Sequence, residues 1–141
     1  PKLMPAGYSA TPLVRKLGFK PGMRVVYVND PAHYVGLLGA LPDDVKLLMR
    51  AGENMDLIHV FCTRVAELER RLASLEPRLA DGGSLWISWP KKTSALASEL
   101  TGDSVRELGL AAGLVDVKVC AVDGDWSGLK FVRRVSDRKK K

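Results

Sequence analysis

Apolar runs alternate with helix-like patterns along the chain, and this alternation predicts the order of the secondary structure. Two late stretches, 114–123 and 129–135, are joined by the turn GDWSG, and the first of them alternates apolar and polar residues. That pair predicts an antiparallel hairpin. Earlier runs that are continuously apolar are typical of strands covered on both faces of a sheet. These predicted strands are 23–29, 45–49, 55–62 and 84–89.

Helix signals lie between these strands. The stretches 11–18 and 30–40 each open with a capping residue followed by proline (Thr-Pro and Asp-Pro), which predicts a helix in each. Thr63 opens a longer predicted helix, which the sequence DGG at 81–83 ends, and a last helix is predicted over 101–113. The apolar positions of the long helix recur at the spacing of a buried stripe: Val65, Leu68, Leu72, Leu75 and Leu79.

This order predicts an α/β fold with three layers, in which a mostly parallel sheet has helices on both faces and ends in a C-terminal antiparallel β-hairpin. The length of 141 residues suits a single domain, which we assign to 11–135. We expect segment 1–10 to be flexible and 136–141 to form a basic tail. No apolar run approaches the roughly 20 residues that span a bilayer, so no membrane partner is expected.

Four stretches carry a family resemblance: LVRKLGFKPGMRVVYVN, MDLIHVF, LERRLASLEPRLADGGSLWISW and AGLVDVKVCAV. They resemble, in this order, parts of the class I S-adenosylmethionine-dependent methyltransferases. Between VKLLM and MDLIHVF there is no room for the usual helix and third strand, so the resemblance implies a shortened Rossmann-like fold that lacks one helix–strand unit. The stretches WPKK and DVKVCAVD also resemble a family of small bacterial proteins to which no chemistry is assigned.

Two positions depart from the methyltransferase pattern. The methyltransferases have a glycine-rich loop after the first strand, which lets the backbone approach the cofactor, and an acidic residue at the end of the second strand. Here the loop at 29–33 reads NDPAH, and the second strand ends in Met49-Arg50. We therefore expect no cofactor and no methyl transfer. The alternative is a divergent methyltransferase that binds S-adenosylmethionine through Asn29, Asp30 and their neighbours.

Ligands of open α/β sheets collect outside the carboxyl ends of the parallel strands. The residues predicted there are rich in basic groups, and the amides that begin the helices after Asp30 and Thr63 would add donors. We therefore expect an anionic small ligand at this rim, and a binding or regulatory role rather than an enzymatic one. The candidate ligand-binding residues are Asn29, Asp30, His33, Arg64, Lys91 and Lys92.

Structural explanations compete with these assignments. Capping of the following helix is enough to explain Asp30. Lys91 and Lys92 can belong to a solvated loop. Arg64 can pair with Glu67 or with Asp30. None of these explanations needs a ligand.

Histidine and tryptophan positions add further expectations. His33 is the better candidate for a general base, whereas His59 lies in an apolar run and is interpreted as a core residue. Trp86 and Trp89 are three residues apart in one strand, which predicts opposite faces of the sheet. Trp126 could be exposed in its turn or folded back over the sheet edge. No nucleophile set and no metal-ligand spacing is found, so we predict no catalytic residue and no metal site.

The net charge of +6 and the pI of about 9.5 permit weak attraction to anions. Part of the excess lies in DRKKK at 137–141. Weak nucleic-acid binding through this tail is a third hypothesis. No face with interleaved aromatic and basic residues supports it, so nucleic acid is not an expected partner.

The two cysteines predict buried thiols, and the segment 45–49 predicts a surface that a partner could cover. Cys62 and Cys120 both fall in apolar runs and predict buried free thiols in a reducing cytoplasm. The segment 45–49 has few elements to cover it because of the missing unit. A second copy of the chain could cover it, so a homodimer is among the expected partners.

Overall fold

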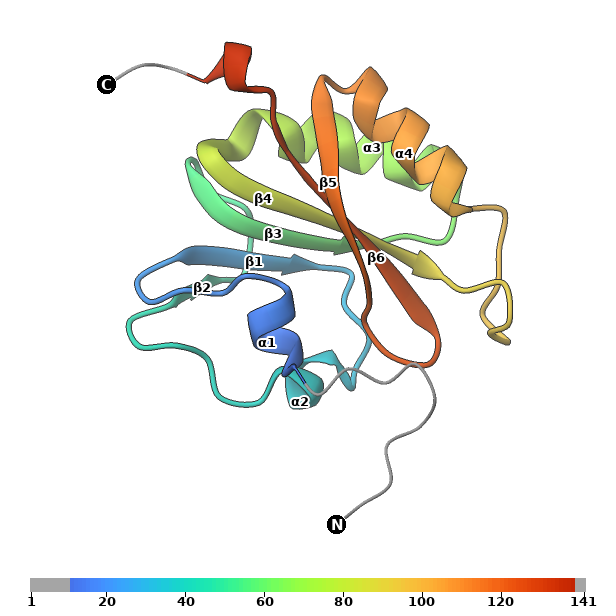
Figure 1. Cartoon of the computed structure of the whole chain (residues 1–141), viewed down its shortest axis with the longest axis horizontal. Coiled ribbons are helices and arrows are strands. Elements are labelled where there is room, and N and C mark those ends of the chain that lie inside the picture. Colours follow the sequence, from blue (N-terminus) through green and yellow to red (C-terminus); the bar gives the residue numbers. More distant parts are fainter. Residues whose placement is uncertain (1–10, 139–141) are drawn as a thin grey trace.

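A computed structural model describes residues 11–138. The predicted flexible segment 1–10 and the last three residues of the predicted tail therefore lie outside the described residues. Six strands form one sheet in the order β2-β1-β3-β4-β6-β5 (Figure 1). The strands are β1 (Arg24–Val28), β2 (Lys46–Leu48), β3 (Met55–Phe61), β4 (Leu79–Pro90), β5 (Leu114–Ala121) and β6 (Trp126–Arg133).

The pairing of the strands agrees with the predicted fold class. β2, β1, β3 and β4 run parallel to one another, and β6 pairs antiparallel with both β4 and β5. The mostly parallel sheet and the C-terminal antiparallel hairpin are both confirmed. The sheet carries helices on both faces, as the three-layer prediction requires.

Two helices lie on each face of the sheet (Figure 1). The first two pack on one face, and the next two pack on the other. No helix in the described part of the chain is long and apolar enough to cross a bilayer. The helices are α1 (Leu13–Lys16), α2 (Tyr34–Leu38), α3 (Val65–Leu75) and α4 (Gly102–Ala111), with 3-10 turns at Glu76–Arg78 and Val135–Asp137.

The core has two halves, one on each face, because successive side chains of a strand point to opposite sides. Trp86 belongs to the half under α1 and α2, where its indole Nε1 donates to the backbone oxygen of Leu17 at 2.9 Å. Trp89 belongs to the half under α3 and α4. The predicted placement of these two tryptophans on opposite faces is confirmed.

The helix predicted over 30–40 starts too early. α2 begins at Tyr34, and His33 precedes it without a side-chain cap, so Asp30 is not the cap of this helix. Asn29 adopts a left-handed backbone with a φ of 61° directly after β1. Asparagine is one of the few residues that enter this region readily, and the change of direction delays the helix by several residues.

The long predicted helix ends earlier than its apolar stripe. α3 stops at Leu75, and Pro77 in the following 3-10 turn cannot continue an α-helical hydrogen-bond ladder. The DGG stretch therefore lies inside β4 and does not end the helix. Gly83 is needed there because a Cβ would lie 2.6 Å from the backbone oxygen of Met55 in β3.

The connection from β2 to β3 is very short. β2 ends at Leu48 and β3 begins at Met55, so residues 49–54 alone carry the chain past β1 between parallel strands. Such crossovers usually take a dozen or more residues and contain a helix. Ala51 packs against the core under α3, so the link crosses on that face. A Cβ at Gly52 would lie 2.9 Å from Nη2 of Arg24 and 3.3 Å from Cδ2 of Leu48, so little space surrounds this link.

Candidate functional site

β1 and β3 form the switch point of the sheet. They are neighbours, but the chain leaves β1 toward β2 on one side and leaves β3 toward β4 on the other. Open α/β sheets bind ligands at such points. Here the side chain of Asn29 spans the two strand ends, and its Nδ2 donates to the backbone oxygen of Phe61 at 3.0 Å. The chain's own side chain therefore bridges the expected crevice.

His33 contacts the turn between β5 and β6. Its Nε2 lies 2.5 Å from Oδ2 of Asp123, and the other oxygen, Oδ1, accepts hydrogen bonds from the backbone N–H groups of Asp125 and Trp126. Burial works against the charge of Asp123, but the bonds from His33 and from the two amides outweigh it and hold its pKa below the usual value. The hairpin thus brings carboxylates to a rim predicted to be basic.

The start of α3 holds two carboxylates of the chain itself. Arg64, and not Thr63, is the residue that precedes the helix, and its side chain forms no cap. The backbone N–H of Thr63 donates to Oε1 of Glu67 at 3.1 Å, and that of Val65 donates to Oε2 of Glu99 at 2.5 Å. These are the amides that were predicted to hold an anionic ligand. The helix terminus is therefore already occupied.

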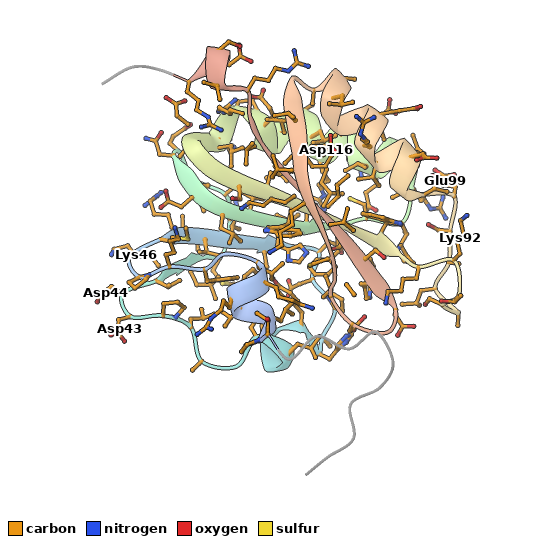
Figure 2. The ribbon with its side chains drawn as sticks, in the orientation of Figure 1. Asp43, Asp44, Lys46, Lys92, Glu99 and Asp116 are labelled. Atoms are coloured by element: carbon orange, nitrogen blue, oxygen red, sulfur yellow. The ribbon has the colours of Figure 1, made fainter. Side chains whose placement is uncertain are left out.

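Lys91 and Lys92 begin the connection from β4 to α4. The backbone N–H of Lys91 donates to the backbone oxygen of Asp125 at 2.8 Å, which fastens the hairpin turn to this connection. Figure 2 shows Lys92 on the same connection as Glu99, at the edge of the molecule. Neither lysine nor Arg64 forms an ion pair within residues 11–138, so Arg64 does not pair with Glu67 or Asp30. Of the six predicted residues, Asn29 also lines the cavity described below.

His59 is the centre of a buried hydrogen-bond chain beneath this rim. Its Nδ1 lies 2.6 Å from the Tyr34 hydroxyl, and its Nε2 lies 2.7 Å from Oγ of Ser88. All three side chains are inaccessible to solvent. Burial lowers the pKa of His59 to about 3, so the ring is neutral at physiological pH. The interpretation of His59 as a core residue is confirmed.

A cavity of about 430 Å³ lies beside the short link, on the α3 face of β1. Three arginines, which we call the cavity arginines, line it: Arg50, Arg71 and Arg78. Val26 and Val28 of β1 contribute apolar lining. Asn29 lines the cavity at the end of this strand. The other lining residues are Val26, Tyr27, Val28, Asn29, Met49, Ala51, Ser74 and Leu75. We call this the arginine cavity.

The charge of the arginine cavity is poorly balanced. Arg78 Nη1 lies 3.6 Å from Oε1 of Glu53, whose side chain is largely exposed, and pairs of this kind contribute little. The Nε of Arg71 is buried and has no hydrogen-bond partner among residues 11–138. A buried donor without a partner costs free energy. No carboxylate is among the residues that line the cavity.

None of the three cavity arginines was among the binding residues predicted from the sequence. Arg50 was noted at the end of the second predicted strand, where the methyltransferases have an acidic residue. Arg71 and Ser74 are three residues apart on α3, which was a readable signal, and Arg78 follows in the 3-10 turn after the helix. Such a polar stripe normally faces solvent. It borders a cavity here because no helix fills the space beside it.

The remaining candidate groups are buried or dispersed. No group of three or more metal-ligating side chains is close enough to hold an ion within residues 11–138. Cys62 and Cys120 are buried free thiols, and burial raises the pKa of Cys62 to about 12. Trp126 is folded back rather than exposed, because it is only 7% exposed and its ring stands edge-on to Phe61 with centroids 5.2 Å apart.

Searches with the sequence and with the structure give different results. No protein-family model and no curated protein sequence matches the chain. The structure matches many solved proteins. It is similar to a possible exported protein from Bordetella parapertussis, with a TM-score of 0.65 and 14% identity over 87% of this chain and 66% of that one.

Solved methyltransferases are also similar. A TehB-like SAM-dependent methyltransferase from Corynebacterium glutamicum matches with a TM-score of 0.53 and 13% identity, over 92% of this chain and 91% of that one. A magnesium protoporphyrin IX methyltransferase from Synechocystis, solved with bound SAM, matches with a TM-score of 0.59 and 12% identity, over 86% and 74%. The chain has the Rossmann-like fold of the class I SAM-dependent methyltransferases in a shortened form. At these identities the likeness concerns the fold alone.

Proposed function

We propose that this chain is a binding protein on a methyltransferase-like fold, and that it holds a small anionic ligand in the arginine cavity. The observation that carries the proposal is the set of three arginines around one cavity of about 430 Å³ without a carboxylate among the lining residues. A phosphate or carboxylate group would give the buried Nε of Arg71 the acceptor that it lacks.

The two sides of the cavity narrow the chemistry of the ligand. Arginine and serine side chains offer hydrogen-bond donors on the α3 side, whereas Val26 and Val28 make the floor apolar. An anion with a small apolar body would use both surfaces. Phosphate monoesters and short-chain carboxylates belong to this class.

Three observations argue against S-adenosylmethionine as the resident cofactor. The loop after β1 contains no glycine, and Arg50 stands at the end of β2 where the methyltransferases have an acidic residue. The side chain of Asn29 is already hydrogen-bonded across the switch point. The proposed ligand site is the arginine cavity, which lies beside the switch point on the α3 face of β1. Asn29 is one of its lining residues.

The test is a calorimetric titration of the full chain with pyrophosphate as the probe. We expect saturable binding to the wild type and a loss of at least tenfold in affinity in Arg71→Met. Arg70→Met is the matched control, because Arg70 is the preceding residue of α3, is exposed and does not line the cavity. Equal affinity in the wild type and both variants would overturn the proposal.

A divergent methyltransferase is the second candidate. The observation that favours it is the His33–Asp123 pair, which could orient a general base near the strand ends of this fold. The same calorimeter separates the two candidates. Micromolar binding of S-adenosylmethionine that is unaffected by Arg71→Met would favour the methyltransferase and remove the support for the arginine cavity.

A further inference from the structure

Four lysines gather beside the end of α1, on the sheet face opposite to the arginine cavity. Lys118 and Lys130 are register partners on β5 and β6. The Nζ of Lys118 donates to the backbone oxygen of Lys16 at 3.2 Å, and the Nζ of Lys16 donates to the backbone oxygen of Ala121 at 3.2 Å. Lys20 follows α1 and adds the fourth charge. We call Lys16, Lys20, Lys118 and Lys130 the lysine surface.

The charges of the lysine surface have no acidic partner within residues 11–138, because none of the ion pairs there includes any of the four lysines. Asp116 of β5 instead pairs with Arg106 of α4 at 3.2 Å on the other face, and Figure 2 shows it well away from α1. Partial burial, followed by the charges of Lys118 and Lys20, holds the pKa of Lys130 below its usual value. A bound polyanion would offset this repulsion.

We propose that the lysine surface binds the phosphate backbone of a nucleic-acid duplex. Ammonium groups gathered on an open surface fit a row of phosphates, which contribute most of the affinity of such contacts. A duplex is favoured over a single strand because no Phe, Tyr or Trp side chain among residues 11–138 is exposed for base stacking. This proposal is independent of the arginine cavity and of the terminal basic tail.

The experiment is fluorescence anisotropy of a labelled 20-base-pair DNA duplex titrated with the full chain. With about four phosphates neutralised, we expect the affinity to fall roughly 100-fold between 50 mM and 200 mM salt. The test variant is Lys20→Gln with Lys118→Gln, since both side chains are exposed and need not disturb the core. We expect it to lose about tenfold in affinity and to have a shallower salt dependence.

A charge-matched control removes two lysines elsewhere. Lys46→Gln with Lys92→Gln has the same net charge as the test variant, and Figure 2 shows these two lysines at opposite ends of the molecule. A second control replaces Lys139 and Lys141 of the tail by glutamine. The proposal requires that only the Lys20 and Lys118 variant loses affinity. It is overturned if the duplex is not bound at 50 mM salt, if all three variants weaken equally, or if only the tail variant weakens.

Discussion

The strand-end rim and the arginine cavity differ in how their polar groups are satisfied. At the rim, Asn29 bonds to Phe61, His33 pairs with Asp123, and the amides of Thr63 and Val65 bond to the carboxylates of Glu67 and Glu99. In the cavity, the buried Nε of Arg71 has no partner within the described residues, and neither has the buried Nε1 of Trp126 beside the rim. Groups that are satisfied internally stabilise the fold, whereas a buried donor without a partner is a candidate contact for a ligand. Substitutions of the hydrogen-bonded rim groups should therefore cost stability, and cavity substitutions should cost ligand affinity.

The largest loss of stability is expected when the buried hydrogen bonds of His59, beneath the rim, are removed. His59→Ala removes the ring that joins Tyr34 to Ser88 and leaves two hydroxyl groups without partners. We expect the free energy of unfolding in urea to fall by about 3 kcal/mol. Lys92→Gln, an exposed rim substitution, serves as the control with little expected change. A loss of less than about 1 kcal/mol in His59→Ala would mean that the hydrogen bonds of His59 to Tyr34 and Ser88 do not support the rim.

The same histidine predicts a pH dependence. Burial lowers its pKa to about 3, while an unfolded histidine titrates near 6.5. Above pH 6.5 both states are neutral and the contribution is fully present. As the pH falls below 6.5, the unfolded state takes up a proton first, so the fold loses up to about 1.4 kcal/mol per pH unit. This loss continues until His59 itself is protonated near pH 3.

Urea unfolding at a series of pH values between 7 and 4 measures this dependence. The non-titrating variant His59→Gln should lose stability less steeply than the wild type over that interval. Parallel curves for the two proteins would contradict the account, because the slope would then come from other groups.

A smaller loss is expected at the switch point. Asn29→Ala removes the bond to Phe61 and places an unsuited residue at a φ of 61°, so we expect a loss of about 2 kcal/mol. Asn29→Gly loses only the side-chain bond, because glycine adopts this backbone freely, and should cost about 1 kcal/mol or less. If Asn29→Gly were the more damaging of the two, the left-handed backbone would not be the reason for the asparagine.

The smallest effect on stability is expected in the cavity. Without a ligand, Arg71→Met should change the free energy of unfolding by no more than about 0.5 kcal/mol, because the variant keeps an apolar stem and removes an unpaired donor. Chemical denaturation in a buffer free of phosphate measures it. A loss similar to that of Asn29→Ala would show that Arg71 has a structural role and that the contrast between the two regions does not hold.

The sequence predicted the sheet well because each buried strand leaves its own local signal. The continuous apolar runs identified β1 to β4 in order, although DGG was assigned to a turn before β4, and the alternating pattern after Gly113 identified the hairpin. The short link between β2 and β3 was also readable as a missing helix–strand unit. The helix at 30–40 was misplaced because the left-handed backbone of Asn29 has no distinct sequence signal.

The site was harder to predict because it depends on distant parts of the chain. Asp123 enters the rim from a turn 90 residues after His33, and Glu99 reaches Val65 from 34 residues away. Neither pairing follows from local spacing. Arg71, Ser74 and Arg78 line a cavity because no helix covers the sheet beside them. The sequence of this segment does not show whether such a helix is present.

The most direct test of the central claim is an NMR titration of the arginine Nε–H signals with pyrophosphate. The account predicts that the Nε–H signal of Arg71 shifts saturably, while the signal of Arg70 and the amide signals of Thr63 and Val65 stay in place. The contrary result would be an unchanged Arg71 signal, together with amide shifts between Asn29 and His33 on addition of S-adenosylmethionine. That result would place cofactor binding at the strand-end rim and favour the divergent methyltransferase over the arginine cavity.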